Sequence, residues 1–330
     1  MRETRLFCKL PEEFVCTPDG MAIDQYGNLV LSCPNFAQDN MSGCVVKIDK
    51  DTREVTKWFD VPVHPETGVA RNMGIAFDDE WNLYLCDNQG WSERPDLLYQ
   101  GRVLKVKADD DGNILESKVV AYRMEHPNGI RVKDGYMYVT QSYLHPIEDK
   151  SGKLVSGVYR FRLDEENVEI TNTYADKNLF CTFLTDNPDC QYGADGIVFN
   201  SKGELFVGNF GDGEVYKIII DDGGHVVENK PFAKDPAQLV STDGLCVDDD
   251  DNIYVADFSY NSIAKITPDG KVERIAQSPD TDGLNGELDQ PGEPIVYQDK
   301  IIASCFDLVT DPGKVNTAHE LPATLSEMDL

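Results

Sequence analysis

The sequence is poor in basic residues. It contains 30 Lys and Arg against 59 Asp and Glu, which gives a formal net charge of −29. Nucleic acids and anionic membrane surfaces bind through basic faces, so this charge balance argues against both as partners. Much of the acid lies in short segments such as DDDDN and KADDDGN, whose composition is typical of solvated turns.

Several other features are missing. No apolar run approaches the roughly 20 residues that cross a membrane, and Met1–Pro11 does not resemble a signal peptide. The nine cysteines are odd in number and include no CxxC pair, which disfavours a disulfide framework and favours a cytoplasmic location. No G-x-S-x-G element or matched Ser/His/Asp arrangement is visible, so we do not expect a covalent serine mechanism.

The chain does contain an internal repeat. A short apolar segment, a turn rich in Asp, Asn and Gly, and an alternating segment recur six times, as in TDGLCVDDDDNIYVAD from Thr242. The polar residues that head the copies are 53, 56, 67, 48 and 50 positions apart, and they are Asp19, Asn72, Asn128, Asp195, Asp243 and Glu293. A self-similar unit near 50 residues indicates a propeller or a solenoid.

The two ends of the chain complement each other. The last copy ends in TLSEMDL, which matches a third strand and has no fourth, while the N-terminal ETRLFCKL matches a fourth strand that belongs to no earlier copy. The sequence therefore predicts an all-β, six-bladed β-propeller of four-stranded blades, closed by the N-terminal strand joining the C-terminal blade. With no linker or low-complexity break, residues 1–330 are expected to form a single domain.

The loop lengths indicate a functional face. In a propeller the first strands line the central channel, and the long connections 88–101, 142–157 and 306–323 fall on the face where those strands begin. Four carboxylates at the channel would repel one another unless some were protonated or a cation lay among them. Oxygen donors without imidazole or thiolate suit Ca²⁺ or Mg²⁺. The alternative is that Asp-Gly and Asn-Gly only supply turn geometry.

The repeats resemble the gluconolactonase, regucalcin and senescence-marker-protein family over essentially the whole chain. The elements that carry the resemblance are GEP, N-M-G, PNGI and ADGI. It implies a metal-dependent hydrolase that opens a small lactone, with the cation held by Glu293, Asn72, Asn128 and Asp195. Calcium is the implied cofactor, with Mg²⁺, Mn²⁺ or Zn²⁺ as alternatives. A second register takes the ligands as Asp19, Asn128, Asp195 and Asp243.

The resemblance also implies a mechanism. The cation polarises the ester carbonyl, and a carboxylate beside it removes a proton from the attacking water. Asp195 is the predicted metal ligand and base, with Asp243 or Asp19 as the substitute base if Asp195 is only a ligand. The residues expected to contact a small-molecule substrate, on a monomer or homodimer, are Asp19, Met73, Trp91, Tyr143, His145, Phe210, Phe258 and Phe306. For each aromatic residue, packing between blades is an equal alternative.

Two other functions stay open at the level of sequence. Relatives of this propeller hydrolyse phosphotriesters, as diisopropyl fluorophosphatase does, with a similar calcium ring. The other alternative is a non-enzymatic scaffold or ligand-binding propeller like the NHL-repeat proteins, which would have a cation-free channel and no turnover on any ester.

Overall fold

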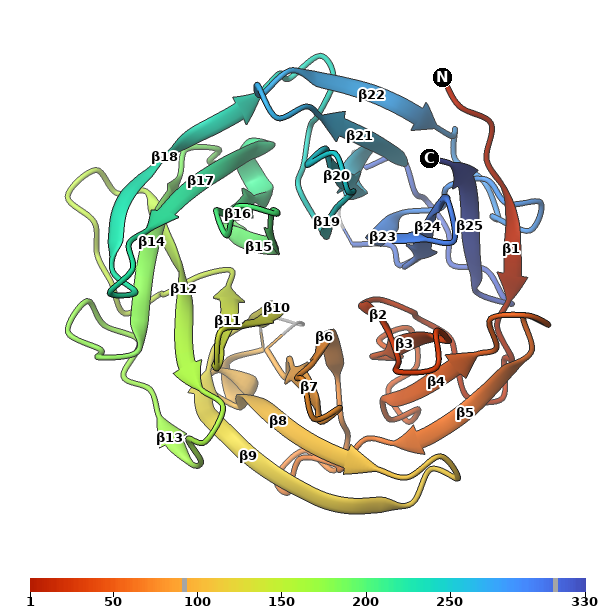
Figure 1. Cartoon of the computed structure of the whole chain (residues 1–330), viewed down its shortest axis with the longest axis horizontal. Coiled ribbons are helices and arrows are strands. Elements are labelled where there is room, and N and C mark those ends of the chain that lie inside the picture. Colours follow the sequence, from red (N-terminus) through yellow and green to blue (C-terminus); the bar gives the residue numbers. More distant parts are fainter. Residues whose placement is uncertain (91–93, 311–313) are drawn as a thin grey trace.

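The computed structural model describes residues 1–90, 94–310 and 314–330. Six β-sheets are arranged in a ring around a common axis, with each sheet running outward from that axis (Figure 1). The predicted all-β, six-bladed propeller is therefore confirmed.

The first strand of each blade lies nearest the axis (Figure 1). These inner strands are β2 (Met21–Ile23), β6 (Asn72–Phe77), β10 (Pro127–Lys133), β15 (Ala194–Phe199), β19 (Leu245–Val247) and β23 (Pro291–Tyr297). Glycines at their heads let neighbouring blades approach closely. A Cβ on Gly74 would lie 2.4 Å from the carbonyl oxygen of Asn128, and one on Gly129 would lie 2.5 Å from that of Asp195. No side chain fits at such distances, which explains why a poor strand former heads these strands.

The second, third and fourth strands follow outward in antiparallel order. The second strands are β3 (Leu29–Cys33), β7 (Leu83–Asp87), β11 (Tyr136–Gln141), β16 (Leu205–Asn209), β20 (Ile253–Asp257) and β24 (Lys300–Cys305). The third strands are β4 (Cys44–Ile48), β8 (Gly101–Ala108), β12 (Leu154–Arg162), β17 (Glu214–Ile220), β21 (Ser262–Ile266) and β25 (Thr324–Asp329). The fourth strands are β5 (Val55–Asp60), β9 (Ile114–Met124), β14 (Leu179–Thr185), β18 (Val226–Lys234), β22 (Val272–Gln277) and β1 (Arg5–Lys9).

One blade differs from the predicted four strands. The two-residue strand β13 (Val168–Glu169), in the connection between β12 and β14, pairs parallel with β9. The second blade thus has five strands, and the fifth comes from the chain of the third blade.

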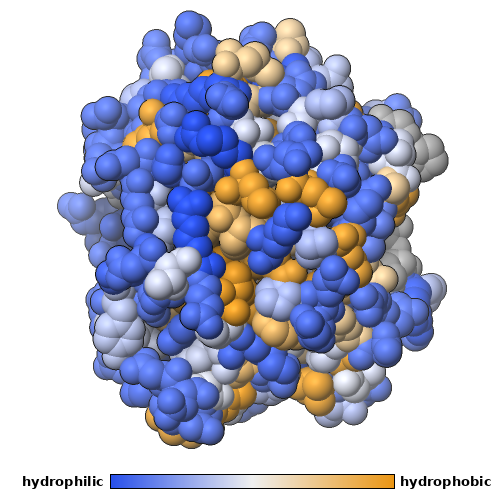
Figure 2. Space-filling view, turned by 90° about the vertical axis from the view of Figure 1, so that its right-hand side faces the viewer, coloured by the Kyte–Doolittle hydropathy of each residue, from blue (hydrophilic) through white to orange (hydrophobic). Residues whose placement is uncertain are grey.

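The ring is closed by the two ends of the chain. Strand β1 pairs antiparallel with β25, with Arg5 opposite Glu327 and Lys9 opposite Thr324, and the two termini lie close together (Figure 1). Phe7 and Leu10 are 6% and 1% exposed and pack with the first blade in one hydrophobic cluster. On this side of the molecule, hydrophilic residues surround one patch of hydrophobic surface (Figure 2). The predicted closure is confirmed.

Apolar side chains fill the spaces between and within the blades, and the second strands are largely buried. Cys33, Cys86, Cys246 and Cys305 lie in or at the ends of strands and are buried there. All nine cysteines are free thiols. In the described ranges, no helix has the length and apolar character needed to span a membrane.

Removing residues 1–10 should destabilise the whole domain, because β25 would lose its outer partner and the burial of Phe7 and Leu10 would be lost. Deleting a buried Phe side chain alone typically costs about 3–5 kcal/mol. Chemical denaturation would measure the loss, with Lys9→Ala, an exposed position of the same strand, as the control. A truncated protein as stable as the full chain would contradict the closure.

Candidate metal centre and active site

In four of the six blades, the inner strand carries a β-bulge at its head. In β6, for example, Asn72 pairs with Asp87, and the next pair is Ile75 with Leu85, so two residues between them face a single residue of β7. The same irregularity occurs in β10, β15 and β23. A bulge of this kind redirects side chains at the end of a strand. The bulges therefore decide which residues meet at the axis.

Strand pairing shifts two residues of the predicted ring, Asn72 and Glu293, by one position each. Asn72 and Pro127 each form the first pair of their blades, so the residues that follow them, Met73 and Asn128, are equivalent. The equivalent positions around the axis are Asp19, Met73, Asn128, Asp195, Asp243 and Gly292. We call these six positions, together with Glu293, the axial ring. Asn72 was assigned to the ring one residue too early, because it stands two residues before its glycine, whereas the residues of four other copies stand directly before theirs.

The side chain of Asn72 lies inside the first two blades. Its Nδ2 donates to Ser32 Oγ at 2.6 Å and to the carbonyl oxygen of Cys44 at 3.0 Å. The residue is fully buried. Asn72 therefore serves blade packing in this arrangement, and the geometry does not group it with the axial carboxylates.

Four carboxyl groups of the axial ring act on one another. Burial raises the pKa of Asp19 to about 8, and the charge of Glu293 adds to the shift. Burial also raises the pKa of Asp195 well above its usual range, and the charges of Asp19 and Glu293 raise it further. The pKa of Asp243 is raised in the same way, by burial and then by Asp195, Asp19 and Glu293. The four groups thus form one electrostatic unit, as the sequence predicted.

An arginine that the sequence reasoning missed crosses this unit. Arg131 of β10 places Nη2 at 2.7 Å from Glu293 Oε1, and the same nitrogen donates to the carbonyl oxygen of Leu245 at 2.8 Å. Burial raises the pKa of Glu293, and Arg131 opposes that shift. The sequence signal was present, since Arg131 stands three residues after Asn128 in a strand that faces the acidic axis.

The donor set of the axial ring fits a hard divalent cation. Arg131 offsets one of four carboxylates, which leaves Asp19, Asp195 and Asp243 with the amide of Asn128. All of these donors are oxygens, and burial and charge alone account for the raised pKa values of Asp195 and Asp243, with no hydrogen bond lowering them. Buried carboxylates without donors favour a cation or a proton among them.

Three aromatic residues form a wall beside the axial ring. The ring centroids of Phe210 and Phe258 are 5.8 Å apart, and those of Phe258 and Phe306 are 5.5 Å apart. Lys314 places Nζ 5.2 Å from the Phe258 centroid, and its charge lowers the pKa of Asp243 against the effect of burial. The wall therefore lies next to the carboxylates, at equivalent positions in three neighbouring blades as predicted. Contact with a substrate stays a prediction.

Tyr143 and His145 belong to a second group of side chains. Their ring centroids are 4.5 Å apart, and His145 Nδ1 is 2.7 Å from Oε2 of Glu125, a fully buried carboxylate that the sequence did not single out. Tyr192 joins this group to the aromatic wall, with centroids 5.8 Å from Tyr143 and 6.0 Å from Phe210.

The three other residues predicted to contact substrate are Asp19, Met73 and Trp91. Asp19 and Met73 occupy axial-ring positions and are 5% and 2% exposed. Trp91 lies outside the described residues.

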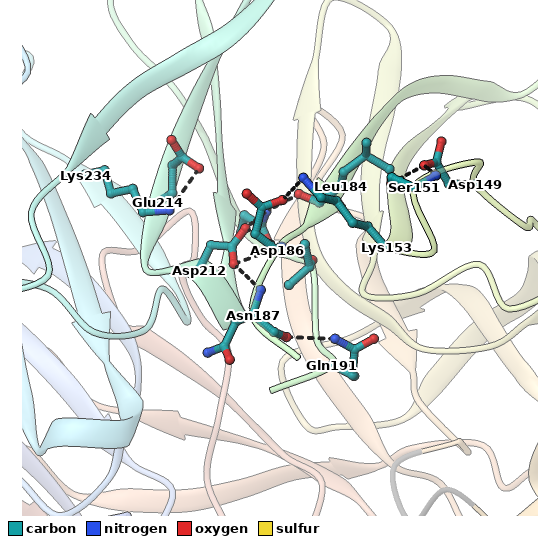
Figure 3. Close-up of polar contacts among 12 residues, drawn as sticks. Asp149, Ser151, Lys153, Leu184, Asp186, Asn187, Gln191, Asp212, Glu214 and Lys234 are labelled. Atoms are coloured by element: carbon teal, nitrogen blue, oxygen red, sulfur yellow. Dashed lines mark hydrogen bonds and ion pairs between the residues drawn. The ribbon is translucent and has the colours of Figure 1, made fainter. Parts of the chain in front are cut away.

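The connection that leads into Asp195 is held by a polar network (Figure 3). Asp212 accepts hydrogen bonds from the backbone N–H groups of Asp186 and Asn187, each at 2.8 Å. Asp212 and Phe210 belong to the same short 3-10 segment, η2 (Phe210–Asp212), which directly follows β16. The network therefore positions the aromatic wall together with the head of β15.

A second acidic cluster was missed by the sequence reasoning. Asp289, Asp307 and Glu320 form this cluster. One carboxylate oxygen from each lies within 4.8 Å of the other two. No three carboxylates of the axial ring, all of which lie in the described part of the chain, are this close together.

By its geometry, the protein is a six-bladed β-propeller with a buried ring of carboxylates on its axis. Residues 133–283, just under half of the chain, match the family model described as the SMP-30/gluconolactonase/LRE-like region. The match confirms, over these residues, the resemblance that the repeats predicted.

Solved structures share the fold over nearly the whole chain. A luciferin-regenerating enzyme has a TM-score of 0.66 at 11% identity, covering 100% of this chain and 96% of its own. A gluconolactonase from Xanthomonas campestris has a TM-score of 0.59 at 17% identity, covering 100% and 95%. The calcium-binding protein regucalcin from Agrobacterium tumefaciens has a TM-score of 0.61 at 12% identity, covering 99% and 93%. No curated protein matches the sequence.

In the cation-free protein, the contribution of Asp19 to stability should fall as the pH rises. Its folded pKa of about 8 lies above the ordinary value of 3.8, so the folded chain keeps a proton that the unfolded chain releases between these values. The stabilising contribution of Asp19 is fully present below the unfolded pKa of 3.8, and it is lost as the pH rises through the folded pKa of about 8. The free energy of unfolding of the wild type relative to Asp19→Asn should decline by up to about 1.4 kcal/mol per pH unit.

Urea denaturation in a chelator from pH 5 to pH 9 would measure this slope. The control is Asp249→Asn, an exposed acid in the turn between β19 and β20. Parallel pH profiles for the wild type and Asp19→Asn would contradict the electrostatic description of the axial ring.

Proposed function

We propose that the protein is a hydrolase that opens a small lactone at the axial ring with the help of a divalent cation. The observation that carries the proposal is the mutual electrostatic effect of Asp19, Asp195, Asp243 and Glu293 at one buried point on the propeller axis. The family match and the structural likeness to a gluconolactonase and to calcium-binding regucalcin support it. A small molecule is the expected partner.

We infer that Asn128 and Asp195 hold the cation together with Asp19 and Asp243. The contacts of the two other predicted ligands support this choice. Glu293 is paired with Arg131, and the Nδ2 of Asn72 is hydrogen-bonded to the first blade. A ligand set with Glu293 and Asn72 would require Glu293 to exchange Arg131 for the cation, and it would require the Oδ1 of Asn72, which is packed against Gly43, to reach the axis.

When bound, the cation would supply polarisation of the ester carbonyl and stabilisation of the charge that develops on it. The chain's own carboxyls would handle the proton. Asp195 and Asp243 are buried, and burial raises their pKa values well above the usual range in the cation-free chain. Asp195, or Asp243 in its place, would accept the proton that the attacking water loses. The aromatic wall of Phe210, Phe258 and Phe306 would exclude water on one side of the substrate.

Asp195→Asn should remove most lactone hydrolysis, because it takes away both a ligand and a candidate base. Losing a general base typically lowers the rate by about 10²–10⁴. The measurement is turnover on a panel of small lactones with and without a chelator, with Asp249→Asn as the control that keeps full activity. Hydrolysis of phosphotriesters but not lactones would overturn the substrate class, and turnover that survives chelation would overturn the metal dependence.

Asp243→Asn and Asn72→Ala should separate the two ligand registers. Asp243→Asn should raise the cation concentration needed for half-maximal activity by roughly tenfold or more, since a charged ligand is lost. Asn72→Ala should lower stability, because two buried hydrogen bonds are lost, and should leave that concentration unchanged. A rise in that concentration for Asn72→Ala, with no change for Asp243→Asn, would support the register that contains Glu293 and Asn72.

A further inference from the structure

The sixth blade carries a compact acidic cluster at the head of its inner strands. Asp289 precedes β23, Asp307 follows β24, and Glu320 lies near the end of the connection 306–323 that leads to β25. Asp289 and Asp307 are each 2% exposed. One carboxylate oxygen from each of the three residues lies within 4.8 Å of the other two. These residues are the blade-six cluster.

Part of the blade-six cluster is well supplied with hydrogen-bond donors. Asp307 Oδ2 accepts from the backbone N–H of Glu320 at 2.7 Å, and Oδ1 accepts from Asn316 Nδ2 at 3.2 Å. His319 contacts both the carbonyl oxygen and the carboxylate of Asp307, with Nδ1 3.2 Å from Oδ2. Asp307 is thus held firmly in place and faces the other two carboxyls.

Three oxygens at the blade-six cluster are buried without donors among the described residues. Asp289 Oδ1 and Glu320 Oε2 accept no hydrogen bond from the described chain, and neither does Oδ1 of Asn316, whose side chain lies against Asp307. Asn316 is 3% exposed. A buried oxygen that loses water and gains no donor costs about 1–3 kcal/mol, and more when it is charged. Three such oxygens in one place indicate a ligand that contacts them.

Protons alone are a poor solution for this cluster. Among the ion pairs of the described residues, the cationic partner of the cluster is His319, against three carboxyls. The acids Asp280 and Asp282 lie close enough to raise the pKa of Asp289 further. Burial is the largest cause of that shift, which takes the pKa of Asp289 to about 8. A divalent cation would neutralise the group and fill the empty coordination of all three oxygens at once.

We propose that Asp289, Asp307 and Glu320, assisted by Oδ1 of Asn316, bind a second divalent cation of the Ca²⁺ type, separate from the axial ring. Ca²⁺ binds six to eight oxygens at about 2.3–2.6 Å, so two ligands on opposite sides of the ion are about 4.6–5.2 Å apart. Carboxylate oxygens within 4.8 Å of one another can therefore all contact one such ion. Water would complete the coordination shell. This site does not depend on the proposed lactonase activity.

The second cation would fasten the connection 306–323 to the head of β23. Between Asp289 and β23, Gln290 accepts the N–H of Phe306 at 2.9 Å on its carbonyl oxygen and the N–H of Leu308 at 2.6 Å on Oε1. The same connection carries Lys314, whose charge acts on Asp243. A cation in the blade-six cluster would thereby stabilise one end of the aromatic wall and the lysine beside the axial ring.

Calorimetric titration of the full chain with Ca²⁺ alone would test the site by stoichiometry. The wild type should bind two ions per chain. Asp289→Asn and Glu320→Gln should each lose one ion and keep the other, and Asp195→Asn should lose the other one. The matched control is Asp280→Asn, an exposed acid that bonds the N–H of Thr317 at 3.1 Å and lies outside the cluster, and it should keep both.

The possible results separate this proposal from the proposed function. A wild type that binds a single ion, lost in Asp195→Asn and kept in Asp289→Asn and Glu320→Gln, would overturn the second site and leave the axial one intact. Loss of an ion in Asp289→Asn, with none lost in Asp195→Asn, would support the second site and overturn the axial one. In a chelator, Asp289→Asn should unfold at an equal or higher urea concentration than the wild type, because a repulsive charge is gone. Should Asp289→Asn not fold, Glu320→Gln carries the same test.

Discussion

The close approach of the six inner strands is the constraint on which the rest of the structure depends. Backbone carbonyls of one blade lie where a Cβ of the next would be, as at Gly20, Gly74 and Gly129. Glycine is required at such contacts, and the residue before it is brought toward the axis whatever its charge. The close packing that closes the ring therefore gathers Asp19 and Asp195, with others, at one buried place.

The cost of this arrangement is electrostatic repulsion, and the protein offsets only part of it. Arg131 reaches from the third blade to Glu293 in the sixth and neutralises one carboxyl. The pKa values of Asp19, Asp195 and Asp243 stay raised, by burial first and then by the charges of the neighbouring carboxyls. Buried carboxylates without counter-charges destabilise a fold, so this arrangement does not serve stability. Relief of the repulsion by a ligand is the basis on which we propose a cation at the axial ring.

The sequence predicts the fold well because the fold is repetitive. Six copies of one pattern define six blades, and the unmatched strands at the two ends define the closure by β1 and β25. Phe210, Phe258 and Phe306 could be found because they occupy the same place in three copies. Features that break the repeat were not predictable in this way. Strand β13 is one, because it leaves its own blade to pair with β9.

The functional site was predicted less well, for two physical reasons. Asn72 stands two residues before its glycine, whereas Asn128 stands directly before its own, and strand pairing shows that Met73 is the equivalent residue at the axis. Long-range proximity is the other reason. Arg131 and Glu293 are 162 positions apart, and the blade-six cluster is assembled from three separate segments.

The most direct test of the account is the number of protons released when Ca²⁺ binds to the axial ring at pH 7. Calorimetry in buffers of different ionisation enthalpy measures this number, and Asp289→Asn removes the contribution of the blade-six cluster. Because the pKa of Asp19 is about 8 and those of Asp195 and Asp243 are raised with it, binding should release about one proton or more. Binding without proton release, or no binding at all, would contradict the claim that repelling buried carboxyls form the cation site.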